Sequence, residues 1–139
     1  EDVRAIQAYA EAEYRRRLEV FTTTYVVCRP TRREAEEYHH HYAVECADTE
    51  GVERLMTLQG MHAQSFPQEM IDALRVQFAG GHGVYPLIGD PDGIADEIER
   101  IHAAGFAGAT LAFVDYLAEL PYFASEVLPR LARKGLRRL

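Results

Sequence analysis

Two kinds of hydrophobic spacing alternate along the chain. Continuous apolar runs, typical of buried strands, cover residues 18–28, 84–88 and 109–114. Each run is followed by a segment in which apolar residues recur every three or four positions, as on one face of a helix: 31–46, 91–103 and 117–139. The pattern therefore predicts three strand–helix units, preceded by a further helix over residues 2–16.

The clearest of these units spans residues 84–116. Gly89 ends its first strand, Asp90 is a suitable N-cap, and Pro91 suits the first helical position. Gly105 favours the left-handed conformation that ends a helix, and a second apolar run follows it. A strand, a helix and a strand of these lengths predict a right-handed parallel βαβ unit.

The remaining segments complete the predicted order of elements. Thr31 and Glu34 have capping-box spacing, so a helix is predicted from there to about Cys46, whose inner edge is Ala35, Tyr38, Tyr42 and Cys46. Residues 48–78 are predicted to form a helical insertion, and the glycine-rich residues 80–83 a tight turn or mobile segment. In the last helix, Pro121 predicts a turn and Pro129 a kink.

The predicted fold class is α/β. Three parallel strands leave two sheet edges with unpaired backbone groups, and a closed barrel of eight such units, typically about 250 residues long, removes both edges. We therefore expect residues 1–139 to form a single partial-barrel domain. It would be the C-terminal part of a (β/α)8 TIM barrel, with about three parallel βα units and a helical insertion over about residues 48–78.

Charge and cysteine content exclude several kinds of partner. The chain has a net charge of -7, with acidic and basic residues interspersed, which argues against binding to nucleic acid or to an anionic membrane surface. The basic exception is the C-terminal stretch, where cations suit the end of a helix: Arg130, Arg133, Lys134, Arg137 and Arg138. Cys28 and Cys46 have neither metal-site nor disulfide spacing, and no signal-peptide pattern is seen, so a cytoplasmic location is expected.

Three stretches carry a resemblance to a known family. They are VFTTTYVVCRPTRREAEEY at residues 20–38, GDPDGIADEIERIHAAGFAGATLAF at 89–113, and FASEVLPRL at 123–131. In this order they resemble the C-terminal part of the bacterial luciferase-like flavin-dependent monooxygenases. The resemblance covers nearly the whole chain and is weakest over residues 48–78.

This resemblance implies a function for the parent protein. Such an enzyme takes reduced FMN from a separate flavin reductase and oxygenates a small organic substrate through a C4a-(hydro)peroxyflavin. Relatives that use the deazaflavin F420 leave that cofactor open. In the family, loops after earlier strands bind most of the flavin phosphate, so this chain alone is expected to be inactive and to hold no cofactor. The alkanesulfonate branch has tyrosine and arginine at the positions of Val114 and Ala79, which argues against a sulfonate substrate.

In such barrels the site lies at the carboxyl ends of the strands. The candidates for cofactor binding or the substrate pocket are therefore His82, Tyr85, Asp115 and Tyr116. Asp115 could instead cap the last helix, and His82 could be an exposed loop residue. Asp90 and Asp92 would repel a phosphate, so helix capping is the preferred role for this pair.

No catalytic residue and no metal site are predicted. Residues 39–41 are three consecutive histidines, but neighbouring side chains on a helix point about 100° apart and cannot converge on one ion. A non-enzymatic alternative also stays open. In it, a catalytically inactive half-barrel buries its open strand edges in a homodimer and serves as a structural or binding module. Either hypothesis predicts a partner for those edges, and a homo-oligomer is expected.

Overall fold

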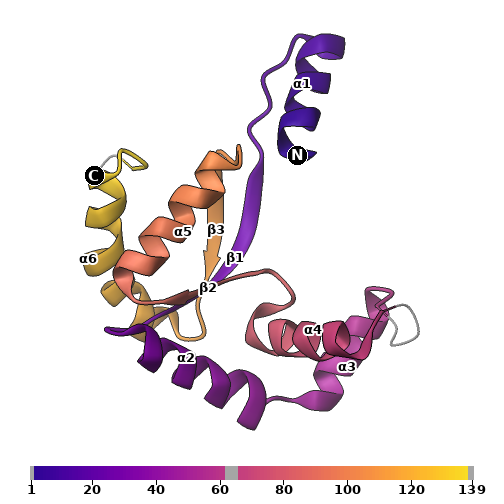
Figure 1. The fold of residues 1–139 in the computed structure, drawn as a ribbon, viewed down its shortest axis with the longest axis vertical. Coiled ribbons are helices and arrows are strands. Elements are labelled where there is room, and N and C mark those ends of the chain that lie inside the picture. Colours follow the sequence, from indigo (N-terminus) through magenta and orange to yellow (C-terminus); the bar gives the residue numbers. More distant parts are fainter. Residues whose placement is uncertain (1, 62–65, 138–139) are drawn as a thin grey trace.

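The computed structural model describes residues 2–61 and 66–137. The predicted strands are all present, each shifted by a few residues at its ends. In chain order the elements are α1 (Asp2–Tyr14), β1 (Phe21–Cys28), α2 (Arg32–His40), the π-helical turn η1 (His41–Glu45), α3 (Thr49–Leu58), α4 (Gln68–Gly81), β2 (Tyr85–Gly89), α5 (Pro91–Ala103), β3 (Gly108–Ala112) and α6 (Tyr116–Arg133), as Figure 1 shows.

The three strands form one parallel sheet in the order β2-β1-β3. Thr24 in the central strand lies opposite Tyr85 on one side and Leu111 on the other. Strands of a closed barrel pair with their neighbours in the chain, whereas here β2 and β3 flank the first strand and do not pair with each other. Within the described residues the sheet is therefore open at β2 and at β3.

Helices cover both faces of this sheet. On one face, Val26, Cys28 and Leu87 pack with residues of α5 and α6, among them the fully buried Phe123. On the other face, Tyr25 and Val27 pack with the buried Ala35, and with Tyr38 and Tyr42 at its margin. Figure 1 shows α5 and α6 on one side of the strands and α3 and α4 on the other. Because both faces of β1 are buried, its last five residues are all buried, and the last four of them, Tyr25 to Cys28, are apolar.

A second core lies outside the sheet, between α3 and α4. It is formed by Val52, Met56, Ile71 and Phe78, all of them buried. These two helices occupy most of the range predicted as a helical insertion, although α4 continues to Gly81. Residues 62–65 of that range lie outside the described residues. The insertion thus has an apolar core of its own.

The predicted helix caps are confirmed. The Thr31 hydroxyl accepts a hydrogen bond from the backbone N–H of Glu34 (3.3 Å), and the Glu34 carboxylate accepts one from the backbone N–H of Thr31 (2.9 Å). Asp90 Oδ1 accepts a bond from the Gly93 N–H (2.8 Å), and Pro91 is the first residue of α5. Gly105 follows that helix with a φ of 107°, in the left-handed region. Local sequence signals therefore set these boundaries.

Two predictions at the helix ends are wrong. The helical segment expected from Thr31 to about Cys46 is present as α2 and the π turn that follows it to Glu45, but Cys46 is exposed instead of lying on the inner edge. Gly80 and Gly81 belong to α4 and are not part of a turn. The physical reason is the close approach of Tyr25, because a Cβ atom added to Gly81 would lie 2.1 Å from that ring. These glycines let the helix lie against β1.

The turn predicted at Pro121 is also wrong, because α6 runs without a break from Tyr116 to Arg133 and contains both Pro121 and Pro129. The basic residues near its end hold it to α5. Arg130 Nε lies 2.6 Å from Asp92 Oδ1, and Lys134 Nζ lies 2.8 Å from Asp96 and 2.7 Å from Glu99. Arg138 lies outside the described residues. Among the helices of the described ranges, none combines the length and the apolar composition that crossing a membrane requires.

Candidate functional site

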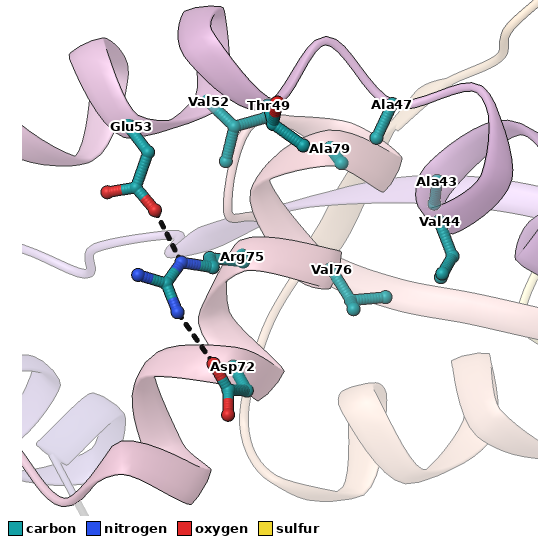
Figure 2. A pocket seen from close by; sticks show the side chains of 10 residues that line it. All are labelled: Ala43, Val44, Ala47, Thr49, Val52, Glu53, Asp72, Arg75, Val76 and Ala79. Atoms are coloured by element: carbon teal, nitrogen blue, oxygen red, sulfur yellow. Dashed lines mark hydrogen bonds and ion pairs between the residues drawn. The ribbon is translucent and has the colours of Figure 1, made fainter.

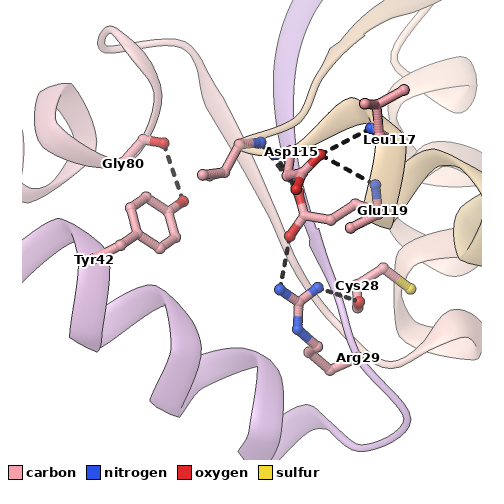
Figure 3. Close-up of polar contacts among 9 residues, drawn as sticks. Cys28, Arg29, Tyr42, Gly80, Asp115, Leu117 and Glu119 are labelled. Atoms are coloured by element: carbon pink, nitrogen blue, oxygen red, sulfur yellow. Dashed lines mark hydrogen bonds and ion pairs between the residues drawn. The ribbon is translucent and has the colours of Figure 1, made fainter.

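The carboxyl edge of the sheet is where parallel strands present side chains to ligands. The strands end there at Cys28, Gly89 and Ala112. Directly after β1, Arg29 Nη2 lies 2.7 Å from Oε1 of Glu119 in α6, as Figure 3 shows. The Glu119 side chain is only 8% exposed and that of Arg29 is 24% exposed. The centre of this edge is therefore a largely buried ion pair.

Glu119 also holds the turn that follows β3. Its second oxygen, Oε2, accepts hydrogen bonds from the backbone N–H groups of Val114 (3.1 Å) and Asp115 (3.2 Å). Asp115 Oδ1 in turn accepts bonds from the N–H groups of Leu117 (2.9 Å) and Ala118 (3.1 Å) and so caps α6. One carboxylate thus fixes the turn after β3 to the end of β1.

Arg29 is fixed from the other side. Its Nη1 donates to the carbonyl of Cys28 (2.9 Å), and its guanidinium carbon lies 3.9 Å from the ring centroid of Tyr38 in α2. This distance is typical of a cation–π contact, for which the planar guanidinium is well suited. Arg29 therefore links β1, α2 and α6 in a single arrangement.

A pocket of about 270 Å³ lies beside this ion pair. Cys28, Arg29, Pro30, Ala118, Glu119 and Tyr122 line it. Burial raises the pKa of the Cys28 thiol to about 11, so the thiol is neutral near pH 7 and is a poor nucleophile. Close by in the chain, Val114, Tyr116 and Leu117 are 53%, 52% and 90% exposed. The edge thus combines a fixed ion pair with an exposed apolar surface, which in folded proteins often marks an interaction site.

The residues of this edge fit only part of a flavin nucleotide. A flat ring can lie on the apolar surface of Val114, Tyr116 and Leu117. A phosphate needs cations or free N–H groups. Of the cations at this edge, Arg29 is paired with Glu119, and Arg130 with Asp92 and Glu126. The first turn of α5 is capped by Asp90 itself. The described residues therefore do not fit the phosphate.

The predicted site residues fall into two groups. Asp115 and Tyr116 lie together at the carboxyl end of β3, where Asp115 caps α6 and the Tyr116 hydroxyl donates to the carbonyl of Leu111 (3.3 Å). His82 ends α4 with a φ of 62°, and Tyr85 begins β2. Tyr85 donates to Glu97 Oε1 (2.5 Å), and this bond raises the pKa of the Tyr85 hydroxyl. The structure does not bring the two groups together, because they lie at opposite ends of their strands.

Sequence analysis missed Arg29 and Glu119. The sequence did contain an indication that Glu119 is buried. It is the first of four residues spaced four apart along the helix, and the other three are buried and apolar: Phe123, Val127 and Leu131. A carboxylate at the head of such a stripe must be paired when the stripe is buried. Arg29, the first residue after a buried strand, was its available partner at the same edge.

A second pocket of about 240 Å³ lies between η1, α3 and α4, away from the carboxyl edge. Its wall is mainly apolar and includes Ala43, Val52 and Val76. Figure 2 shows Arg75 between Glu53 and Asp72, with 2.6 Å between its Nη1 and Asp72 Oδ1. Among the described residues that line this pocket, Arg75 is the cation and both carboxylates lie against it, so the pocket offers no unpaired cation to an anionic ligand.

Comparison by sequence finds no relative, whereas comparison by fold does. No protein-family model and no curated protein matches the chain. The crystal structure of DmoA from Hyphomicrobium sulfonivorans matches with a TM-score of 0.73 and 21% identity, over 96% of this chain and 34% of DmoA. The structure of riboflavin lyase (RcaE) with modified FMN and the substrate riboflavin matches with a TM-score of 0.74 and 21% identity, over 98% of this chain and 36% of RcaE.

The chain thus spans about a third of the length of each of these two proteins. The similarity extends over nearly all of this chain. The predicted α/β fold class with three parallel strands is confirmed. The chain therefore has an α/β fold with an open, three-stranded parallel sheet that is similar to about a third of each of these two structures.

Proposed function

We propose that this chain is the C-terminal portion of a reduced-FMN-dependent, luciferase-like monooxygenase that acts on a small organic substrate. The observation that carries the proposal is the fold similarity to a riboflavin lyase solved with modified FMN and riboflavin, over 98% of this chain. The three sequence stretches of the family resemblance, in their expected order, support it independently. Fold alone does not determine function, so the proposal also depends on the residues of the site.

When bound, reduced FMN would supply the chemistry that activates oxygen. The residues of this chain would shape the part of the site formed by the last strands. The Arg29–Glu119 pair fixes the turn after β3, so Val114, Tyr116 and Leu117 are held on one rigid surface. Such a surface can cover the flavin ring and exclude water from it. The main contribution of this chain would then be the buried Glu119 carboxylate, which holds this apolar surface in place before the flavin binds.

The phosphate would be bound outside this chain, because the described cations at the carboxyl edge are already paired. A phosphate-binding site on earlier βα units is consistent with a chain that spans about a third of its structural neighbours. A separate reductase would deliver the reduced flavin. F420 is the alternative cofactor, since a surface that recognises only a flat ring does not distinguish the two.

The test uses the complete reading frame that encodes this sequence, expressed beside the 139-residue chain. We expect the longer protein to bind FMN, measured by quenching of flavin fluorescence, and to incorporate oxygen into an organic substrate when reduced FMN is supplied. Parallel titration with F420 decides between the cofactors. Failure of the longer protein to bind either one would refute the proposal.

A pair of variants tests the role of the apolar surface. Leu117→Lys should weaken FMN binding to the longer protein by about tenfold or more, because burying a leucine side chain contributes about 1.5–3 kcal/mol. Leu58→Lys is the matched control, since Leu58 is also highly exposed but lies at the end of α3 in the insertion. If the two variants bind FMN with equal affinity, Leu117 is not part of the binding site.

A second candidate function rests on the open sheet edges. Within the described residues, β2 and β3 each have one unpaired edge, and Phe21 beside β3 is 58% exposed. Edges of this kind favour pairing with another chain. A half-barrel homodimer acting as a structural or binding module is therefore the alternative.

A further inference from the structure

The turn after α2 brings an exposed thiol next to an imidazole. His41–Glu45 is a π-helical turn, in which the backbone N–H of Cys46 donates to the carbonyl of His41 (2.9 Å). In an α-helix, side chains five positions apart point about 140° away from each other. The wider π turn pairs such residues through the backbone, and turns of this kind are frequent at functional sites. The local backbone thus creates a contact that an ordinary helix would not.

The side chains of this turn are ordered as nucleophile, base and orienting carboxylate. Cys46 Sγ lies 3.7 Å from His41 Nε2 and 4.0 Å from Nδ1. His41 Nδ1 lies 2.8 Å from Glu45 Oε2, and His40 Nε2 lies 3.8 Å from the other oxygen of Glu45. The hydrogen bond from His41 lowers the pKa of the Glu45 carboxyl, so this group is a carboxylate near neutral pH. With Nδ1–H donated to Glu45, Nε2 is the unprotonated nitrogen of the ring, and it is the nearer of the two ring nitrogens to the thiol.

We propose that Cys46 is a modification site for low-molecular-weight disulfides, with His41 as its base and Glu45 as the residue that positions His41. Cys46 is exposed, as a small disulfide requires, whereas Cys28 is buried. A thiol next to a histidine in a solvent-accessible position is the usual environment of a reactive cysteine. The proposal is independent of flavin chemistry, because η1 belongs to the other face of the sheet from the pocket beside Glu119.

The reaction is a thiol–disulfide exchange. Sγ of Cys46 attacks one sulfur of the disulfide RSSR, and its proton passes to Nε2 of His41. The new bond joins Sγ to the attacked sulfur, the original S–S bond breaks, and the leaving thiolate RS⁻ takes the proton from His41 as RSH. The balance is one protein thiol and one disulfide giving one mixed disulfide and one small thiol, so no further oxidant is needed.

The experiment measures exchange rates on the 139-residue chain. The probe is 4,4′-dithiodipyridine, a neutral disulfide whose released thiopyridone is followed by absorbance. Reaction with oxidised glutathione followed by peptide mass mapping then identifies the modified residue. We expect Cys46 to react first and His41→Gln to slow its exchange by about tenfold, below the usual range for enclosed general bases because this site is open to water. Far-ultraviolet circular dichroism confirms that each variant is folded.

His40→Gln is the matched control. His40 also lies near Glu45, but the hydrogen bonds of Cys46 within the described residues go to His41 and not to His40, so replacing His40 should change the rate much less than His41→Gln does. The nitrogen-15 chemical shifts of His41 report its tautomer, and Glu45→Gln should move them. The proposal is overturned if His41→Gln reacts as fast as the wild type, or if Cys28 in a Cys46→Ser variant reacts as fast as Cys46.

Discussion

At the scale of single residues, Glu119 is the side chain on which the carboxyl edge depends most. It pairs with Arg29, 90 positions away in the chain, and accepts two backbone N–H groups after β3. A buried carboxylate is stable only when its charge and lone pairs are matched, and here all of these partners come from the edge itself. Glu119 therefore acts as a junction between β1, β3 and α6.

We expect Glu119→Ala to lower the free energy of unfolding by about 3 kcal/mol, because Arg29 and the two N–H groups lose their partner at once. Urea denaturation measures the change. The control is Glu36→Ala, which removes the exposed pair of Arg32 and Glu36 at an N–O distance of 2.7 Å. Surface pairs of that kind contribute about 0.2–1 kcal/mol. A loss for Glu119→Ala no greater than that of the control would contradict the role of Glu119.

At the scale of elements, the contact between β1 and α2 includes a buried pair of titratable groups. The Tyr25 hydroxyl lies 3.0 Å from His39 Nε2, and burial raises the pKa of Tyr25 to about 12. Burial, and to a smaller extent the charge of His40, lowers the pKa of His39 from its ordinary value of 6.5. His39 is therefore neutral in the folded chain near pH 7, and its Nε2 shares a hydrogen bond with the Tyr25 hydroxyl.

This arrangement predicts a direction for the pH dependence of stability. Because the pKa of His39 is lower in the folded than in the unfolded chain, the unfolded chain takes up a proton first as the pH falls below 6.5. Stability contributed by neutral His39 is thus fully present above pH 6.5 and is lost below it. Urea midpoints at about pH 7.5 and about pH 5.5 should differ less in His39→Gln than in the wild type. His102→Gln, which changes a histidine of α5, serves as the control; an unchanged difference in His39→Gln would show that other groups cause the loss.

At the scale of the whole molecule, the open sheet decides how the chain can associate. β1 is shielded on both faces and paired on both sides, whereas β2 and β3 each have a free edge within the described residues. The structural neighbours are about three times longer than this chain, which leaves room for further βα units at these edges. In the absence of such units, another copy of the chain is the most available partner.

We therefore expect the isolated 139-residue chain to self-associate. Size-exclusion chromatography with light scattering should give a mass of at least twice 15.7 kDa at micromolar concentration. If the longer protein proposed above is a monomer while the chain is not, the edges are normally covered within one polypeptide. A monomeric chain would contradict both the homodimer alternative and the importance of the open edges.

The sequence by itself determined the elements and several of their ends. The capping box at Thr31, the Asp90-Pro91 start of α5 and the stop at Gly105 were all predicted, because each depends on hydrogen bonds between residues a few positions apart. The predicted boundary at Pro121 failed for the opposite reason, since packing of the buried Phe123 and Val127 against α5 keeps α6 helical through the proline.

Only the tertiary structure decided the strand order, the covering of both sheet faces and the site. Arg29 and Glu119, or Tyr25 and Gly81, meet through pairing and packing between distant segments, and hydrophobic periodicity contains no information about which segments those are. The contact of His41 with Cys46 is local, yet it depends on a π turn that helical spacing does not reveal. Short-range hydrogen bonding thus set where individual helices begin and end, and the burial of apolar faces set how the helices and strands are arranged in space.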